Sequence, residues 1–255
     1  MQRRLRRGGA VPPYVIILVA VLLLGLGTPA SAGPRTAATL AKQPRPVPTA
    51  LTELPARIHQ AVRVIRSARY CAEVHCTVVQ SWQRDSTGGW QRVRTTDGTF
   101  AVRGQIGYNG FAPQGEKRQG DGRTPTGVYD IVTAFSTDDA NPGTAMPWRQ
   151  RKPTSTVTNY AGELYNTWIE EAGRTDGDRP AMRYGFWIDY NHGRLEPGVG
   201  PAPVQGRGSG IFLHTVDVDE RFGPTLGCVA VSPAKAWWLL RWLDPATNPR
   251  VLLNR

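Results

Sequence analysis

One cysteine and one histidine lie close together in "GIFLHTVDVDERFGPTLGCVAVS", near the C-terminal end of this 255-residue chain. A thiol becomes a nucleophile when a neighbouring base takes its proton, and imidazole is the usual base. Cys228 follows His214 by fourteen residues, and the turn at Gly223-Pro224 can bring the two side chains together. The pair predicts nucleophilic acyl chemistry. The alternative is a buried, inert cysteine, because free cysteine is among the most buried residue types.

The loop before Cys228 offers what acyl chemistry needs next, a site for the oxyanion of the tetrahedral intermediate. Gly227 has no side chain that would block a substrate carbonyl, and the backbone N–H groups around it can bind an oxyanion. Each such donor is worth about 10²–10³ in rate. A catalytic pair is also expected to hold the thiol pKa well below its ordinary value of about 8.5, whereas a non-catalytic site would not.

The elements that must position these residues are mainly strands. Turn pairs such as Asp97-Gly98 and Asn109-Gly110 separate short β-branched and aromatic runs from residue 77 onward. We predict strands within 126–136, 182–193 and 210–216. The fold class is therefore mainly β with a few helices.

Two further segments flank those strands. A helix is predicted from an N-cap at Ser232 to just before Pro245, with Leu239, Leu240 and Leu243 facing the core. The segment 136–181 is long, polar and irregular, which is typical of lids or binding loops on a β scaffold.

The N-terminal part of the chain has three predicted segments. Residues 1–32 read as a signal peptide, with four arginines, an apolar run and an Ala-Ser-Ala cleavage site. A retained membrane anchor is the alternative, although the apolar run is short of the roughly 20 residues that span a bilayer. Residues 33–51 are a Pro/Ala-rich linker, 52–70 a short amphipathic helix, and 71–255 the catalytic-like domain. The protein is expected to be secreted, extracytoplasmic and associated with the cell wall.

Charge and composition narrow the expected partners. The chain has 31 Lys and Arg against 20 Asp and Glu, giving a net charge of +11. A basic protein is attracted to anionic polymers, which outside the membrane are wall polymers or anionic lipid. The basic residues are scattered and no nucleic-acid motif is present, so we expect no nucleic-acid partner. The scarcity of lysine among abundant Ala, Gly and Pro is typical of an actinobacterium.

The other two cysteines lie five residues apart. An oxidising compartment favours a disulfide between Cys71 and Cys76. The alternative is a metal site that also uses His75, but three ligands so close in sequence do not match common zinc spacings. The disulfide is favoured, no metal is expected, and Cys228 is left unpaired.

Three segments taken in order, "GDGRTPTGVYDI", "GIFLHT" and "PTLGCVAVS", resemble the YkuD-type L,D-transpeptidases, and the resemblance covers roughly 76–253. It implies a secreted β-sandwich or barrel-like domain involved in cell-wall biogenesis and cell shape. Its cysteine would cut the peptidoglycan tetrapeptide stem after the third residue, release D-Ala, and pass the acyl group from a thioester to an amine, making a 3→3 cross-link. With water as acceptor it would be an L,D-carboxypeptidase. The family implies no cofactor, stem peptides as partners, and carbapenem-type β-lactams as covalent inhibitors.

The resemblance also implies residue roles. Cys228 would be the nucleophile and His214 the base, oriented by the backbone carbonyl of Thr215, and Gly227 with the Cys228 amide would form the oxyanion hole. The commonest family motif is Ser-His-Gly-Cys followed by an aliphatic residue and an arginine. Here Leu226 replaces the motif histidine.

The motif arginine is also missing, since Ala230 stands in its place. A stem peptide carries carboxylates that a guanidinium would bind, and Arg207 or Arg183 are the candidates to replace it. Tyr190 and Asn191 are candidates to line the cleft.

The order and spacing of these residues fit other cysteine enzymes less well. A sortase has its histidine much further upstream and an arginine soon after the cysteine, and papain-like peptidases have cysteine before histidine. A non-catalytic cell-wall-binding module that kept the fold and lost the chemistry remains the alternative from another class.

Overall fold

The computed structural model describes residues 46–255 except 70, 100, 176–178 and 217–222. The predicted signal peptide and residues 33–45 of the predicted linker lie outside the described residues. The chain divides into Met1–Pro44 and Arg45–Arg255, and every element below belongs to the second unit. Within the described part, no helix has the length and apolar character needed to cross a membrane.

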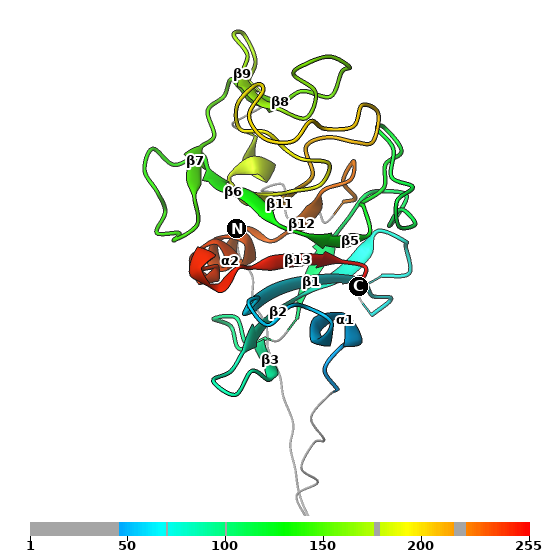
Figure 1. Cartoon of the computed structure of the whole chain (residues 1–255), viewed down its shortest axis with the longest axis vertical. Coiled ribbons are helices and arrows are strands. Elements are labelled where there is room, and N and C mark those ends of the chain that lie inside the picture. Colours follow the sequence, from blue (N-terminus) through cyan, green and yellow to red (C-terminus); the bar gives the residue numbers. More distant parts are fainter. Residues whose placement is uncertain (1–45, 70, 100, 176–178, 217–222) are drawn as a thin grey trace, which may run out of the picture. The chain divides into compact units, whose positions relative to one another are not determined.

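The second unit is mainly β, as predicted, and is built on one curved eleven-stranded sheet (Figure 1). The strands run in the order β5-β13-β1-β2-β4-β12-β11-β10-β6-β7, β3 pairs with β2, and β8 and β9 form a separate hairpin. The strands are β1 (Gln60–Arg66), β2 (Cys76–Arg84), β3 (Trp90–Val93), β4 (Val102–Gln105), β5 (Gly127–Tyr129), β6 (Ile131–Ser136), β7 (Trp148–Gln150), β8 (Ser155–Val157), β9 (Trp168–Glu170), β10 (Tyr184–Ile188), β11 (Phe212–Thr215), β12 (Val229–Val231) and β13 (Arg250–Leu253).

Both faces of the sheet are covered. Apolar side chains of the central strands pack with α2 (Pro233–Trp242) into the main core, and a second cluster lies with α1 (Thr49–Thr52) on the other face. A third, aromatic cluster consists of Phe135, Trp168, Trp187 and Phe212. Two short 3₁₀ helices, η2 (Pro180–Met182) and η3 (Pro245–Thr247), complete the elements.

The predicted helix over 52–70 is wrong, because Gln60–Arg66 form the central strand β1. β1 pairs antiparallel with β2 and parallel with β13. Val62 and Val64 enter the main core and Ala61 enters the cluster on the opposite face. A strand buried on both faces does not alternate between apolar and polar residues. The spacing of the apolar residues in β1 therefore also fitted a helix.

The boundary of the linker moves for a related reason. The short helix α1 lies at Thr49–Thr52, inside the predicted linker, and the side chain of Leu51 on it is fully buried. Packed structure therefore begins before residue 52.

The segment 126–136 is two strands where one was predicted. β5 pairs with β13, whereas β6 pairs with β10 and β7 elsewhere in the same sheet. The break falls at Asp130, which the local pattern does not mark. The C-terminal helix is confirmed as α2, with Pro233 as its first residue and Leu239 and Leu240 buried. It ends at Trp242, earlier than predicted, and the buried Leu243 that follows has an extended backbone.

Candidate active site

Two neighbouring parallel strands place the predicted pair on one face of the sheet, two positions apart in register. β11 and β12 pair with Leu213 opposite Val229, so Phe212 lies beside Cys228 and His214 lies two residues further along. Side chains alternate across a strand, so Phe212 and His214 share one face of β11, and Cys228 projects from the same face of the sheet. Cys228 is a free, half-buried thiol immediately before β12.

The ring of His214 is held in one tautomer. Its Nδ1 lies 2.6 Å from the carbonyl oxygen of Thr215 and 2.8 Å from that of Ala181, which belongs to η2. Carbonyl oxygens only accept hydrogen bonds, so Nδ1 carries the proton and Nε2 keeps its lone pair. Burial lowers the pKa of His214, helped by the charge of Arg151. The imidazole is therefore neutral at pH 7, which is the form a general base needs.

The thiol of Cys228 is also neutral. Its sulfur accepts the N–H of Phe212 at 3.4 Å and lies 3.4 Å from the carbonyl oxygen of Gly210. Part of the residue opens to solvent, but its side chain packs on the aromatic cluster. That burial raises the pKa of Cys228 to about 11, although the Phe212 N–H and the charges of Arg151 and Lys117 act in the opposite direction. Desolvation thus outweighs the favourable charges, and the thiol pKa moves opposite to the direction expected of a catalytic pair. By that criterion alone the thiol does not separate a catalytic site from the non-catalytic alternative.

The nucleophile loop, defined here as residues 225–228, is held by its own threonine. The N–H of Gly227 donates to the hydroxyl of Thr225 at 3.1 Å, and that hydroxyl donates to the Cys228 carbonyl at 2.7 Å. Gly227 has φ +148°, and a Cβ there would lie 2.9 Å from the Arg123 carbonyl oxygen, so glycine is required. Because the Gly227 amide is engaged by Thr225, the Cys228 amide is the better candidate for an oxyanion donor.

A cleft of about 410 Å³ opens in front of Cys228. Its walls are formed by Tyr108, the loop 117–122, residues between 151 and 182, residues 209–212 and the nucleophile loop. The irregular middle segment therefore does contribute to the site. The residues that line the cleft are Tyr108, Lys117, Gln119, Gly120, Gly122, Arg151, Thr156, Val157, Asn159, Arg179, Met182, Ser209, Gly210, Ile211, Phe212, Leu226, Gly227 and Cys228.

The four residues predicted to bind substrate are not among the described residues that line this cleft. The hydroxyl of Tyr190 donates to the Arg207 carbonyl at 2.9 Å. The side chain of Asn191 donates to the carbonyls of Val204 and Gly208 at 3.0 and 2.9 Å, so both residues hold the 204–208 loop. The fourth, Arg183, lies over the ring of Tyr184, with 5.0 Å between guanidinium and ring centroid.

Three other basic residues line the cleft, namely Lys117, Arg151 and Arg179. Lys117 is buried and forms an ion pair with Asp121 at 2.6 Å. The buried guanidinium of Arg151 lies 5.3 Å from the ring centroid of Trp168 and 5.9 Å from that of Phe212. Sequence reasoning missed these residues because they are isolated basic residues in irregular segments.

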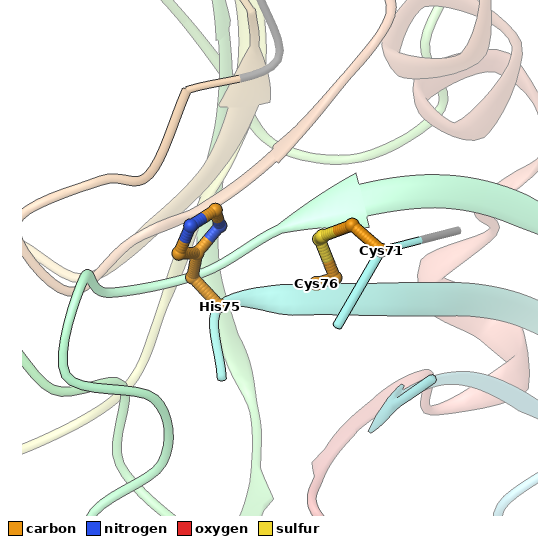
Figure 2. A group of neighbouring side chains, drawn as sticks. All are labelled: Cys71, His75 and Cys76. Carbon is orange, nitrogen blue, oxygen red and sulfur yellow. A yellow bond between two sulfur atoms is a disulfide. The ribbon is translucent and has the colours of Figure 1, made fainter. Parts of the chain in front are cut away.

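A disulfide joins Cys71 to Cys76 beside the end of β4, as Figure 2 shows. The nearby His75 has its Nδ1 2.6 Å from Oε1 of Gln105. The two sulfur atoms and a ring nitrogen of His75 lie within 4.8 Å of one another, which is close enough for a shared metal. With both sulfurs bonded to each other, however, neither is a thiolate ligand.

Comparison with known families identifies the domain. Residues 83–252 match the family model YkuD, the L,D-transpeptidase catalytic domain. The chain belongs to this family. The match runs from β2 to β13 and includes both His214 and Cys228, so the resemblance seen in the sequence is confirmed. No curated protein and no solved structure matched the chain. The domain is thus of the L,D-transpeptidase type, a family of cell-wall enzymes that act on peptidoglycan and are sensitive to β-lactams.

Proposed function

We propose that this protein is an exported L,D-transpeptidase with Cys228 as nucleophile and His214 as general base. The observation that carries the proposal is the state of His214. Its Nδ1 donates to two backbone carbonyls, which leaves Nε2 as a proton acceptor on the same sheet face as a free thiol. A cleft large enough for a peptide opens in front of that thiol. Membership of the family supports the assignment to peptidoglycan.

The first half-reaction forms a thioester. The carbonyl between the third stem residue and D-Ala lies against Sγ of Cys228, and Nε2 of His214 takes the thiol proton as sulfur attacks. A C–S bond forms, and the carbonyl π electrons move to oxygen, which the Cys228 amide binds. The tetrahedral intermediate collapses when the C–N bond to D-Ala breaks. The His214 imidazolium returns its proton to the leaving amine, and the acyl group stays on sulfur.

The second half-reaction releases the enzyme. An amine from a neighbouring stem attacks the thioester and gives a proton to His214. The C–S bond breaks, the sulfur of Cys228 is protonated again, and a 3→3 cross-linked dimer leaves. If water attacks instead, the product is a tripeptide stem and the reaction is that of an L,D-carboxypeptidase.

Neutral reactants suit this site. A neutral thiol and a neutral imidazole tolerate the desolvated surroundings of Cys228 better than an ion pair does, and charge develops only as sulfur attacks. The positive charges of Arg151 and Lys117 favour that developing negative charge. The burial that raises the thiol pKa therefore does not prevent a reaction in which His214 removes the proton during attack.

Location and partners complete the proposal. Export is supported by the arginines, apolar run and Ala-Ser-Ala pattern of residues 1–32. The protein then acts in the wall on peptidoglycan stem peptides, and carbapenem-type β-lactams acylate Cys228.

Mass spectrometry of the purified protein with tetrapeptide-stem muropeptides tests the proposal, with Cys228→Ala as the matched control. Cross-linked dimer and free D-Ala that disappear in Cys228→Ala support a transpeptidase. Tripeptide without dimer identifies a carboxypeptidase. If the unmodified protein turns over no stem and a carbapenem leaves Cys228 unmodified, the assignment is wrong and the non-catalytic wall-binding module takes its place.

A further inference from the structure

Three segments that are distant in sequence pack backbone against backbone beneath the nucleophile loop. The N–H of Tyr108 donates to the Thr225 carbonyl at 3.0 Å, and the N–H of Ala112 donates to the Thr124 carbonyl at 2.8 Å. The approach is so close that a Cβ on Gly107 would lie 2.3 Å from the carbonyl oxygen of Gly122. The loop that carries Cys228 therefore rests on a densely packed base.

The side chain of Thr124 lies at the centre of this base and is fully buried. Its hydroxyl oxygen accepts the N–H of Gly107 at 3.0 Å. The single hydroxyl hydrogen is directed to the Gly227 carbonyl oxygen at 2.8 Å, and the Cys228 carbonyl is further away at 3.4 Å. Thr124 thus joins the 107 segment to the nucleophile loop from a position more than one hundred residues away in sequence.

The peptide bond between Gly227 and Cys228 is the unit that Thr124 holds. In a planar trans peptide the C=O and the following N–H point in opposite directions. Fixing the Gly227 carbonyl against the buried Thr124 hydroxyl therefore fixes the Cys228 N–H away from the packed base. Thr225 holds the other two groups that flank this peptide, the Gly227 N–H and the Cys228 C=O. With both threonines in place, this peptide plane has little freedom to rotate.

We propose that Thr124 is a positioning residue that orients the Cys228 amide as the oxyanion donor by holding the Gly227 carbonyl. This inference rests on the proposed function, because it assigns a role within the same acyl transfer. A preorganised donor is effective because it needs no reorganisation when charge develops on the substrate oxygen.

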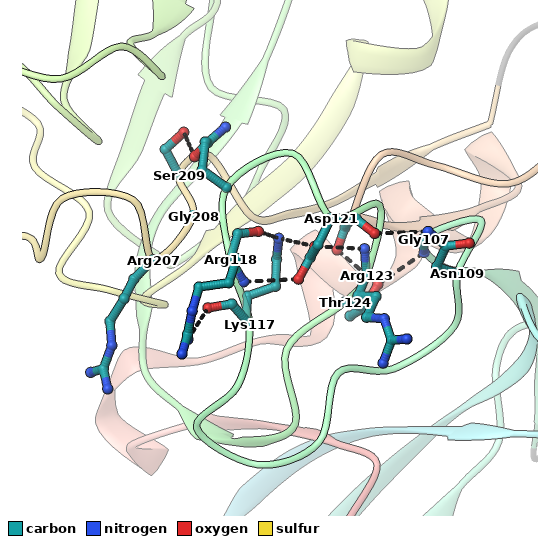
Figure 3. Close-up of polar contacts among 12 residues, drawn as sticks. Gly107, Asn109, Lys117, Arg118, Asp121, Arg123, Thr124, Arg207, Gly208 and Ser209 are labelled. Atoms are coloured by element: carbon teal, nitrogen blue, oxygen red, sulfur yellow. Dashed lines mark hydrogen bonds and ion pairs between the residues drawn. The ribbon is translucent and has the colours of Figure 1, made fainter.

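The turn before Thr124 is itself fixed by one carboxylate. Asp121 accepts the Lys117 ammonium at 2.6 Å and the backbone N–H groups of Arg118 and Arg123 at 2.8 and 2.9 Å. Figure 3 shows this carboxylate with its partners Lys117, Arg118 and Arg123, and Thr124 follows Asp121 by three residues in the chain. Asp121 therefore ties the residues on both sides of this turn together just before the buried Thr124.

The test compares two reactions of Cys228 that differ in the oxyanion. Acylation by a carbapenem passes through a tetrahedral oxyanion, whereas alkylation by iodoacetamide does not. In Thr124→Val, which keeps the volume and loses the hydroxyl, we expect the acylation rate at saturating carbapenem to fall about 10- to 100-fold, a loss typical of misplaced catalytic groups. The alkylation rate at the same pH should stay within about twofold, because the thiol itself is unchanged.

Two further variants separate positioning from stability. Thr124→Ser keeps the hydroxyl and should return acylation to within about threefold of the unmodified protein. Thr133→Val is the matched control, because Thr133 is equally buried and its hydroxyl donates to the Pro147 carbonyl at 2.9 Å, away from the cleft. Its acylation rate should stay within about twofold. Thr124→Ala, which leaves room for a water, replaces Thr124→Val if the latter does not fold.

Each result decides one question. Unchanged acylation in folded Thr124→Val, an equal fall in alkylation, or an equal loss in Thr133→Val would each overturn the positioning role. If the unmodified protein is not acylated at Cys228 at all, the proposed function fails, and that result is seen before any variant is compared.

Discussion

The protonation state of Cys228 gives the sharpest prediction. Burial on the aromatic cluster raises the thiol pKa to about 11. The thiolate fraction at neutral pH is then about a hundredfold smaller than for an ordinary cysteine, since each pH unit is a factor of ten. We therefore expect the proposed acyl transfer to start from a neutral thiol and a neutral His214, with no thiolate–imidazolium pair in the free protein.

The perturbation is replacement of His214 by asparagine, combined with a change of pH. Iodoacetamide reacts with the thiolate, so its rate in the unmodified protein should rise about a hundredfold between pH 7 and pH 9, without a plateau in that range. The same rise is expected in His214→Asn, with rates within about threefold at each pH. Carbapenem acylation should behave differently and fall about 10²–10⁴-fold in His214→Asn, because the general base is lost.

The pH dependence of acylation follows from the protonation state of His214. His214 has a pKa lowered by burial, and only its neutral form accepts a proton. Acylation by the unmodified protein should therefore decline only below the ordinary histidine pKa of about 6.5, and should stay level above it until the thiol ionises. Mass spectrometry of the peptide that contains Cys228 measures both reactions, and Cys71 and Cys76 do not react because they form the disulfide.

One pattern would refute the reasoning. An alkylation rate that is level between pH 6 and pH 8, and that falls when His214 is replaced, would mean that a thiolate–imidazolium pair already exists. In that case the positive charges around Cys228 outweigh the desolvation of its thiol.

Three other predictions follow from particular contacts. Gly227→Ala should lower the carbapenem acylation rate at least about a hundredfold, because the new Cβ meets the Arg123 carbonyl oxygen and the nucleophile loop must shift. A variant that keeps its acylation rate would contradict this tight packing. Replacing Cys71 and Cys76 by serine should lower the free energy of unfolding, measured in urea, by about 2 kcal/mol. The value is modest because the disulfide closes a short loop, and an unchanged free energy of unfolding would mean that the bond does not stabilise the fold. Arg207→Gln should keep muropeptide turnover within about twofold, since its side chain does not line the cleft, and a large rise in KM would restore its predicted role.

The sequence alone was enough to indicate the family and much of the local structure. Three features were sufficient to indicate the family. They are the types and spacing of His214 and Cys228, the glycine before the cysteine, and the order of three short motifs. The final helix was predictable because capping and the spacing of Leu239, Leu240 and Leu243 are encoded within a few residues.

Only the tertiary structure decided what depends on residues distant in sequence. The pairing of β11 with β12 places Cys228 beside Phe212, and neither strand alone specifies its neighbour. The hydrogen bond from Thr124 to Gly227 joins residues 103 positions apart in sequence. Desolvation by packed aromatic side chains raises the pKa of the Cys228 thiol, whereas the sequence alone led us to expect a lowered pKa. β1 was mispredicted for the same reason, since burial on both faces removed its alternation. Local patterns encode backbone preference and reactive groups, whereas partners and dielectric surroundings come from the packing of the whole domain.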